Sequence, residues 1–220
     1  MLESIQEGTS SFGMSDYFSL KRSAPVVPDN GGYDYRQGEL NPEILKMFAR
    51  EMDVRVNPDE CYSENPRYYE PVVWEPFAGT NVAKSRSIAE KSGLELIAND
   101  IQERDGVIVA DAKNGPSQTI GGMIFHPTYY GSSFSENGDI GSLPKDQYIE
   151  ELGRVVDAAL DEASSGFLAC IVARHYMFKG ERIDLDKWMI EVFSSRGFDL
   201  LRVWSSPPDV ALLMKFEDLP

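Results

Sequence analysis

A glycine turn and two acidic residues stand at the ends of three successive strand candidates. The first candidate, residues 71–75, runs through Gly79 into a helix, and a glycine at such a turn lets a ligand approach the backbone closely. Asp100 ends the second candidate about 20 residues later, where a carboxylate can hold vicinal ribose hydroxyls. Asp111 ends the third, within reach of an adenine amino group. Each feature alone is common in α/β proteins, but the three in this order predict a site for an adenosyl-type ligand.

The elements that must position these residues alternate between strand and helix from residue 71 onward. The apolar runs show little alternation, which is typical of strands covered on both faces and hence of a mostly parallel sheet. The last two strands are joined by Ser-Ser-Pro-Pro-Asp, which is too short for a crossover helix, so we expect them to be antiparallel. The strand candidates are 71–75, 94–100, 106–111, 121–126, 166–175, 198–204 and 210–216, and the helix candidates are 81–93, 144–163 and 184–197.

The N-terminal part has a different composition. Residues 1–40 are rich in Ser, Gly, Pro and Asp, which predicts an irregular arm. Helical periodicity first occurs in Asn-Pro-Glu-Ile-Leu-Lys-Met-Phe, so we place the main domain at residues 41–220.

Composition restricts the class of protein. The chain has 220 residues, enough for one domain, and a net charge of −15, which argues against a protein that coats nucleic acid with its whole surface. No apolar run approaches the ~20 residues of a membrane helix, and the N-terminus lacks the apolar segment of a signal peptide. The two cysteines belong to no metal-binding motif, so we expect a cytoplasmic protein without a membrane anchor or a bound metal.

Two motifs resemble those of a known family. Trp-Glu-Pro-Phe-Ala-Gly-Thr (74–80) resembles motif I, D-P-F-x-G-x-G, of the amino-group DNA methyltransferases. Ile-Phe-His-Pro-Thr-Tyr-Tyr-Gly (124–131) resembles their catalytic motif IV, [D/N/S]-P-P-[Y/F/W]. The likeness covers about residues 70–217. It implies a Rossmann-like class I methyltransferase fold, an α/β fold whose seven-stranded, mostly parallel sheet has an antiparallel last strand and helices on both faces.

The resemblance also implies a reaction and a set of residues. The family uses S-adenosylmethionine to methylate adenine-N6 or cytosine-N4, and its pattern places the cofactor on Glu75, Phe77, Gly79, Thr80, Asp100 and Asp111. His126, Pro127 and Tyr129 correspond to the reaction centre, where two acceptors hold the amine protons and an aromatic ring stacks on a flipped base. An imidazole accepts a proton only when it is neutral, so His126 must be unprotonated.

The substrate is less closely defined by the motifs. Thr128 and Tyr130 adjoin the reaction centre, while Lys179, Arg182 and Lys187 form a basic cluster that suits either a DNA phosphate or plain solvent exposure. No segment is long enough for a separate target-recognition domain. We therefore expect DNA to be bound either directly or with a partner subunit in a homo- or hetero-oligomer.

The departures from the family pattern leave alternatives open. Asn81 stands in place of the second glycine of motif I, and Thr128 in place of the second proline of motif IV. A catalytically silent methyltransferase fold that serves as a binding or scaffold subunit is one alternative. A methyltransferase acting on RNA or on a small molecule is another.

Overall fold

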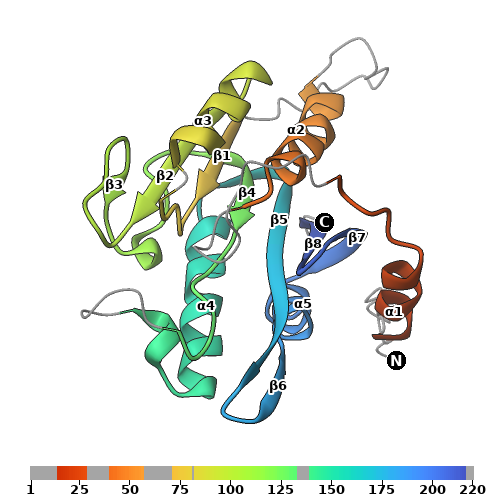
Figure 1. Cartoon of the computed structure of the whole chain (residues 1–220). Helices are drawn as coiled ribbons and strands as arrows, with labels where there is room; N and C mark the ends of the chain where they lie inside the picture. Colours follow the sequence, from red (N-terminus) through yellow and green to blue (C-terminus); the bar gives the residue numbers. More distant parts are fainter. Residues whose placement is uncertain (1–13, 29–39, 57–70, 81, 133–138, 217–220) are drawn as a thin grey trace, which may run out of the picture.

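The structure is a computed structural model that describes residues 14–28, 40–56, 71–80, 82–132 and 139–216. From residue 71 onward its helices and strands follow the succession that the sequence predicts, apart from the additional strand β6 (Figure 1). The helices are α1 (Met14–Arg22), α2 (Pro42–Val56), α3 (Val82–Lys91), α4 (Lys145–Leu160) and α5 (Leu185–Ser194), with short 3-10 helices η2 (Ala112–Asn114) and η3 (Ile140–Ser142). The strands are β1 (Val72–Glu75), β2 (Glu95–Asp100), β3 (Ile108–Val109), β4 (Ile120–Phe125), β5 (Ala163–Phe178), β6 (Glu181–Asp184), β7 (Phe198–Ser206) and β8 (Asp209–Phe216).

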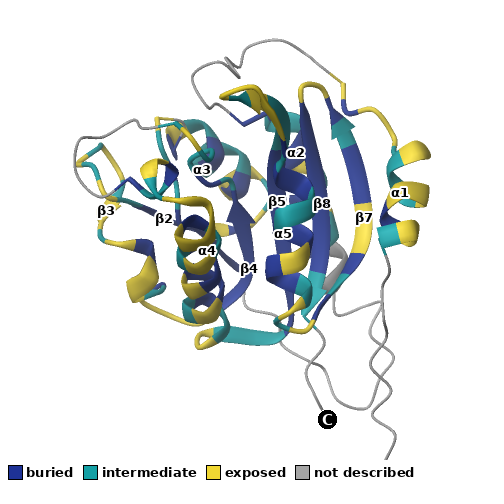
Figure 2. Cartoon of the chain, turned by 90° about the horizontal axis from the view of Figure 1, so that it is seen from below, coloured by how far each residue is buried: buried dark blue, intermediate teal, exposed yellow. Residues whose placement is uncertain are grey.

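The main sheet has the order β3-β2-β1-β4-β5-β8-β7. The pairs from β3 to β5 are parallel, whereas β8 lies antiparallel to both β5 and β7. Figure 2 shows β3 at one side of the molecule and β7, with α1 beside it, at the other. The expected antiparallel arrangement of the last two strands is confirmed, and with it the predicted class I methyltransferase architecture.

An additional strand, β6, was not predicted. It pairs antiparallel with the end of β5 through His175–Asp184 and Phe178–Glu181 and lies off the main path of the sheet. Its sequence, Glu-Arg-Ile-Asp, carries one apolar residue, so no hydrophobic run marks it as a strand. The strand exists because β5 extends beyond the sheet and turns back on itself.

Helices cover both faces of the sheet and bury two apolar clusters. One cluster joins the strands to α4 and α5, through residues such as Leu152, Met189 and Phe193. The other joins them to α2 and α3. Close packing on that side needs a glycine, because a Cβ on Gly122 of β4 would meet Phe48 Cζ at 3.0 Å.

The prediction of an irregular N-terminal arm is wrong in part, because residues 14–22 form the helix α1. Tyr17 supplies the reason: its side chain is fully buried against the main domain. After the helix, Val26 forms a parallel bridge with Ser205 of β7. Residues 1–13 and 29–39 of the arm lie outside the described residues. Among the helices that are described, none combines the length and apolarity that a membrane span requires.

Candidate cofactor and reaction site

The turn after β1 is held to the end of β2. The backbone N–H of Gly79 donates to Asp100 Oδ2 (2.9 Å), and the N–H of Gln102 donates to Oδ1 (2.9 Å). Gly79 has φ of +55°, a left-handed conformation that favours glycine. The two predicted cofactor residues therefore meet, and Asp100 also shapes the turn.

Glu75 ends β1 as a buried carboxyl group. It is 3% exposed, and its Oε2 has no hydrogen-bond partner among the described residues. Burial raises the pKa of Glu75 to about 8, while nearby Ser85 and Arg86 lower it to a smaller extent. With this pKa the carboxyl is mostly protonated at neutral pH, so a cationic ligand group beside its unused oxygen would bind with release of that proton.

Phe77 of the motif I turn contacts the strand that leads into motif IV. Its ring contacts Phe125 edge-on, with centroids 5.3 Å apart, and Phe125 is the residue immediately before His126. Since β1 and β4 are also paired in the sheet, the motif I turn and the motif IV loop are neighbours. The structure thus places Phe77, one of the predicted cofactor residues, in contact with the end of the strand that carries His126.

Thr80 and Asp111 lie farther out on the surface. Thr80 is exposed, and Asp111 is exposed at the start of η2, where its carboxylate accepts from Lys113 N (3.0 Å). The side chain of Asp111 also lies 3.4 Å from Lys113 Nζ. Their roles toward a cofactor remain predictions.

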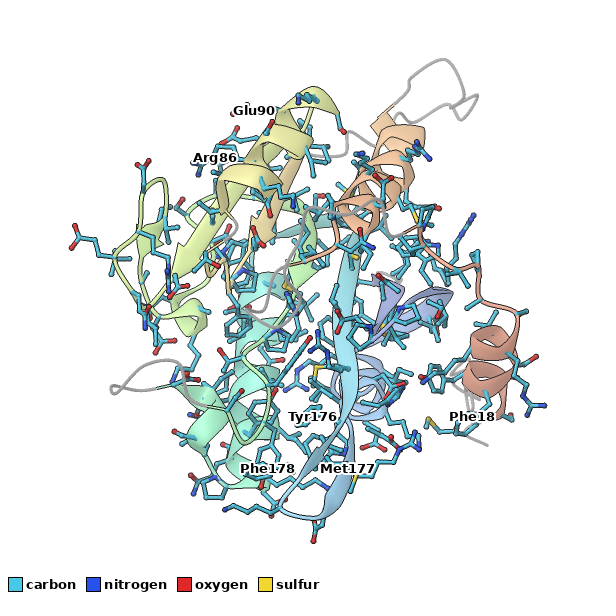
Figure 3. All side chains as sticks on the ribbon, viewed as in Figure 1. Phe18, Arg86, Glu90, Tyr176, Met177 and Phe178 are labelled. Atoms are coloured by element: carbon cyan, nitrogen blue, oxygen red, sulfur yellow. The ribbon has the colours of Figure 1, made fainter. Side chains whose placement is uncertain are left out.

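The loop after β4 is fixed through its backbone carbonyls. The hydroxyl of Tyr148 donates to Thr128 O (3.0 Å), and the hydroxyl of Tyr176 donates to Tyr130 O (2.7 Å). The N–H of Gly131 in turn donates to Gly141 O (2.7 Å). Tyr130 itself packs on rings from α4, β5 and α5, so the loop rests on a layer of aromatic side chains. Figure 3 shows Tyr176 in this region, toward the lower end of β5.

His126 lies partly buried at the start of this loop, and Pro127 is buried beside it. His126 Nε2 lies 3.0 Å from Tyr129 Oη, and that hydroxyl donates to Asp209 Oδ1 (3.1 Å). Burial lowers the pKa of His126 below its usual 6.5; Asp209 raises it and Arg174 lowers it to smaller extents. The imidazole is therefore neutral at physiological pH, as an acceptor must be.

The ring of Tyr129 is in contact with other side chains. Tyr176 stacks on it at a centroid distance of 5.7 Å, and the guanidinium carbon of Arg174 lies 5.2 Å from its centroid. The stacking of a flipped base on Tyr129 remains a prediction.

The predicted basic cluster lies on the β5–β6 hairpin and on α5. Lys179 is exposed in the hairpin turn, whereas Arg182 and Lys187 both donate to Asp184, each at 2.6 Å. Two of the three cations are thus paired with a carboxylate.

Sequence inspection missed Asp209 and Arg174. They are paired across β5 and β8, and Arg174 donates to Asp209 through both Nε (2.7 Å) and Nη2 (3.1 Å). Asp209 is 3% exposed. The only signal in the sequence was a charged residue at the edge of each of two apolar strands.

His175 points away from this network and toward α1. Its Nδ1 lies 3.2 Å from carboxylate oxygens of both Asp184 and Asp186, and Lys21 Nζ lies 2.5 Å from its Nε2. The side chains of His175, Asp184 and Asp186 are close enough to share a metal ion. However, Lys21, Arg182 and Lys187 already supply the positive charge that the two carboxylates need.

The sheet topology is that of a Rossmann-like class I methyltransferase fold. No family model and no curated protein matches the sequence. Among solved structures, the chain is similar to a Listeria monocytogenes protein assigned to the class I S-adenosylmethionine-dependent methyltransferases, with a TM-score of 0.50 and 10% identity over 95% of this chain and 70% of that one. At this identity the similarity concerns the fold alone.

Two further structures match with lower scores. One is 1,6-didemethyltoxoflavin-N1-methyltransferase of Burkholderia thailandensis with bound S-adenosylhomocysteine (TM-score 0.48, 13% identity, 67% of this chain and 71% of that one). The other is the glycopeptide N-methyltransferase MtfA with S-adenosylmethionine (TM-score 0.45, 12% identity, 78% and 93%).

Proposed function

We propose that this protein is an S-adenosylmethionine-dependent methyltransferase that acts on an exocyclic amino group of a DNA base, adenine-N6 or cytosine-N4. The observation that carries the proposal is the adjacency of the Gly79 turn and the His126 loop, joined by Phe77 and Phe125 at one sheet edge. The neutral imidazole of His126 supplies the acceptor that an amine substrate requires.

The residues at this edge fit the cofactor. Gly79 leaves open space where a side chain would stand, since a Cβ at this residue would have Phe77 O of its own turn, at 4.0 Å, as its nearest neighbour. Glu75 Oε2, which has no partner within the described part of the chain, suits the ammonium group of the methionine part, and Asp100 suits the ribose hydroxyls. When bound, the cofactor supplies an electrophilic methyl group on its sulfonium.

The chain's own residues would then orient the amine. As the amine nitrogen forms its bond to the methyl carbon, the bond between that carbon and the sulfonium sulfur would break and the amine would give up an N–H proton. His126 and the Pro127 carbonyl are the proposed acceptors. Lys179 and Arg182 are the proposed phosphate contacts. Because the whole chain carries a net charge of −15, such phosphate contacts are confined to this region or are completed by a partner subunit.

The test is methyl transfer from radiolabelled S-adenosylmethionine to unmodified DNA, single- and double-stranded, followed by nucleoside analysis. We expect label in N6-methyladenine or N4-methylcytosine, and loss of transfer in His126→Ala. His175→Gln is the matched control, because the chain has only two histidines and this one faces α1. Methyl transfer to RNA or to a free nucleoside but not to DNA would refute DNA as the substrate. Absence of cofactor binding by calorimetry would favour a catalytically silent scaffold.

A further inference from the structure

A continuous chain of hydrogen bonds connects β5 and β8 to the imidazole of His126. Arg174 holds both oxygens of Asp209 at 2.7 and 3.1 Å. Asp209 Oδ1 accepts from the hydroxyl of Tyr129 at 3.1 Å, and that hydroxyl oxygen lies 3.0 Å from His126 Nε2. All four side chains are buried or half-buried, so water does not readily replace these bonds.

The direction of each bond follows from counting protons. A bidentate guanidinium holds Asp209 as a carboxylate, which can only accept. The single hydroxyl proton of Tyr129 is therefore committed to Asp209, and the phenol oxygen can face His126 only as an acceptor. His126 Nε2 must then carry a hydrogen. In a neutral ring the other nitrogen, Nδ1, is left with the lone pair.

We propose that Asp209 and the Tyr129 hydroxyl are positioning groups that fix His126 as its Nε2–H tautomer, so that Nδ1 is the one acceptor atom of the ring. The tautomer follows from the hydrogen-bond chain alone. The catalytic consequence of this tautomer is that Nδ1 accepts the hydrogen bond from the N–H of the substrate amine. This consequence rests on the proposed function.

The surroundings of Tyr129 favour this role for its hydroxyl. Its ring is stacked by Tyr176 and contacted by Arg174, and its pKa is raised by burial and by Asp209, with Arg174 acting in the opposite direction. A phenol held in place in its neutral form keeps the proton that the arrangement needs. A free imidazole, in contrast, exchanges between its two tautomers.

Nitrogen-15 NMR of protein labelled at histidine tests the assignment directly. His175→Gln identifies the signals of His126, because the chain has no third histidine. Above the pKa of His126 we expect one tautomer, with Nε2 at the shift of a protonated nitrogen and Nδ1 at that of an unprotonated nitrogen. In Tyr129→Phe, which keeps the ring but loses the hydroxyl, we expect averaged shifts from a mixture. Asp209→Asn should preserve the wild-type tautomer, since its amide oxygen can still accept from Tyr129.

An Nδ1–H tautomer in the wild type, or shifts unchanged by Tyr129→Phe, would overturn the proposal. Kinetic measurements then distinguish the tautomer assignment from the proposed role of His126 in methyl transfer. If methyl transfer occurs, Tyr129→Phe should lower kcat several-fold and leave the KM for the cofactor unchanged. A wild type that shows the expected tautomer but transfers no methyl group would refute the proposed function and leave the tautomer assignment standing.

Discussion

Asp100 Oδ2 accepts a hydrogen bond of 2.9 Å from the backbone N–H of Gly79, which joins the ends of β1 and β2. The same carboxylate accepts from Gln102 N through its other oxygen and lies 3.6 Å from Arg104 Nε. An acid predicted to bind the ribose therefore also determines the shape of the turn that faces the cofactor.

For this reason we expect Asp100→Ala to weaken S-adenosylmethionine binding by roughly 1–3 kcal/mol, because the ribose loses a charged acceptor and the Gly79 turn loses its anchor. Isothermal titration calorimetry measures the change. Glu103→Ala, an exposed acid in the following loop, controls for the altered net charge. An unchanged affinity in Asp100→Ala would show that this carboxylate serves only the turn.

Glu75 should make stability depend on pH. Its pKa is raised by burial from 4.5 to about 8, so between these values the folded protein holds a proton that the unfolded chain has released. The free energy of unfolding should fall as pH rises through this window and become level above it. Glu75→Gln cannot ionise and should lose this part of the dependence. Urea titrations at several pH values measure it, with Glu103→Gln as the exposed control; parallel curves for Glu75→Gln and wild type would contradict the expectation.

The pH profile of methyl transfer should reflect His126. Burial lowers the pKa of this imidazole from 6.5, against the opposing effect of Asp209, and the neutral form is the acceptor. We expect kcat at saturating cofactor to fall at a pH below 6.5, as the imidazole becomes protonated. His126→Asn carries an amide acceptor at every pH, so it should retain activity and lose this acid limb. A limb that persists in His126→Asn would assign the titration to another group.

Gly141 of η3 is expected to control the position of the reaction loop. A Cβ at this residue would meet the carbonyl oxygen of Tyr129 at 2.7 Å and collide with that of Ser132. Gly141→Ala must therefore displace the loop that carries His126. We expect methyl transfer to be lost while cofactor affinity, which depends on the β1 and β2 ends, is kept. Equal turnover in Gly141→Ala would show that the loop adapts without consequence.

The docking of α1 depends on a buried polar contact. The Tyr17 hydroxyl donates to Asp186, a fully buried carboxylate that also pairs with Lys21 at 2.7 Å. Loss of a hydrogen bond to a charged group costs about 1.5–3 kcal/mol, so Tyr17→Phe should loosen α1 by that order. Hydrogen exchange of residues 14–22 measures this. Phe18→Ala, at a side chain 40% exposed on the same helix, should change little, and equal effects of the two variants would contradict the assignment.

From residue 71 onward, local sequence patterns predict the succession of strands and helices along the chain, apart from β6, and the edge of the sheet at which the candidate residues lie. Apolar runs without alternation predict buried parallel strands, and the short Ser-Ser-Pro-Pro-Asp connection requires an antiparallel pair. Because parallel strands share one carboxyl edge, Gly79, Asp100 and His126, which follow or end three such strands, lie at the same edge of the sheet. These inferences succeed because they depend on local pattern and chain geometry.

The surroundings of those residues depend on contacts between segments that are far apart in the chain. Asp209 lies 80 residues from Tyr129, and the two meet because β8 pairs antiparallel with β5 and brings Asp209 opposite Arg174. Likewise, α1 and β6 carry little hydrophobic pattern of their own and are held by Tyr17 and by the extension of β5. Hydrogen-bond direction at His126 depends on partners far apart in the chain, so it follows from packing and not from local sequence.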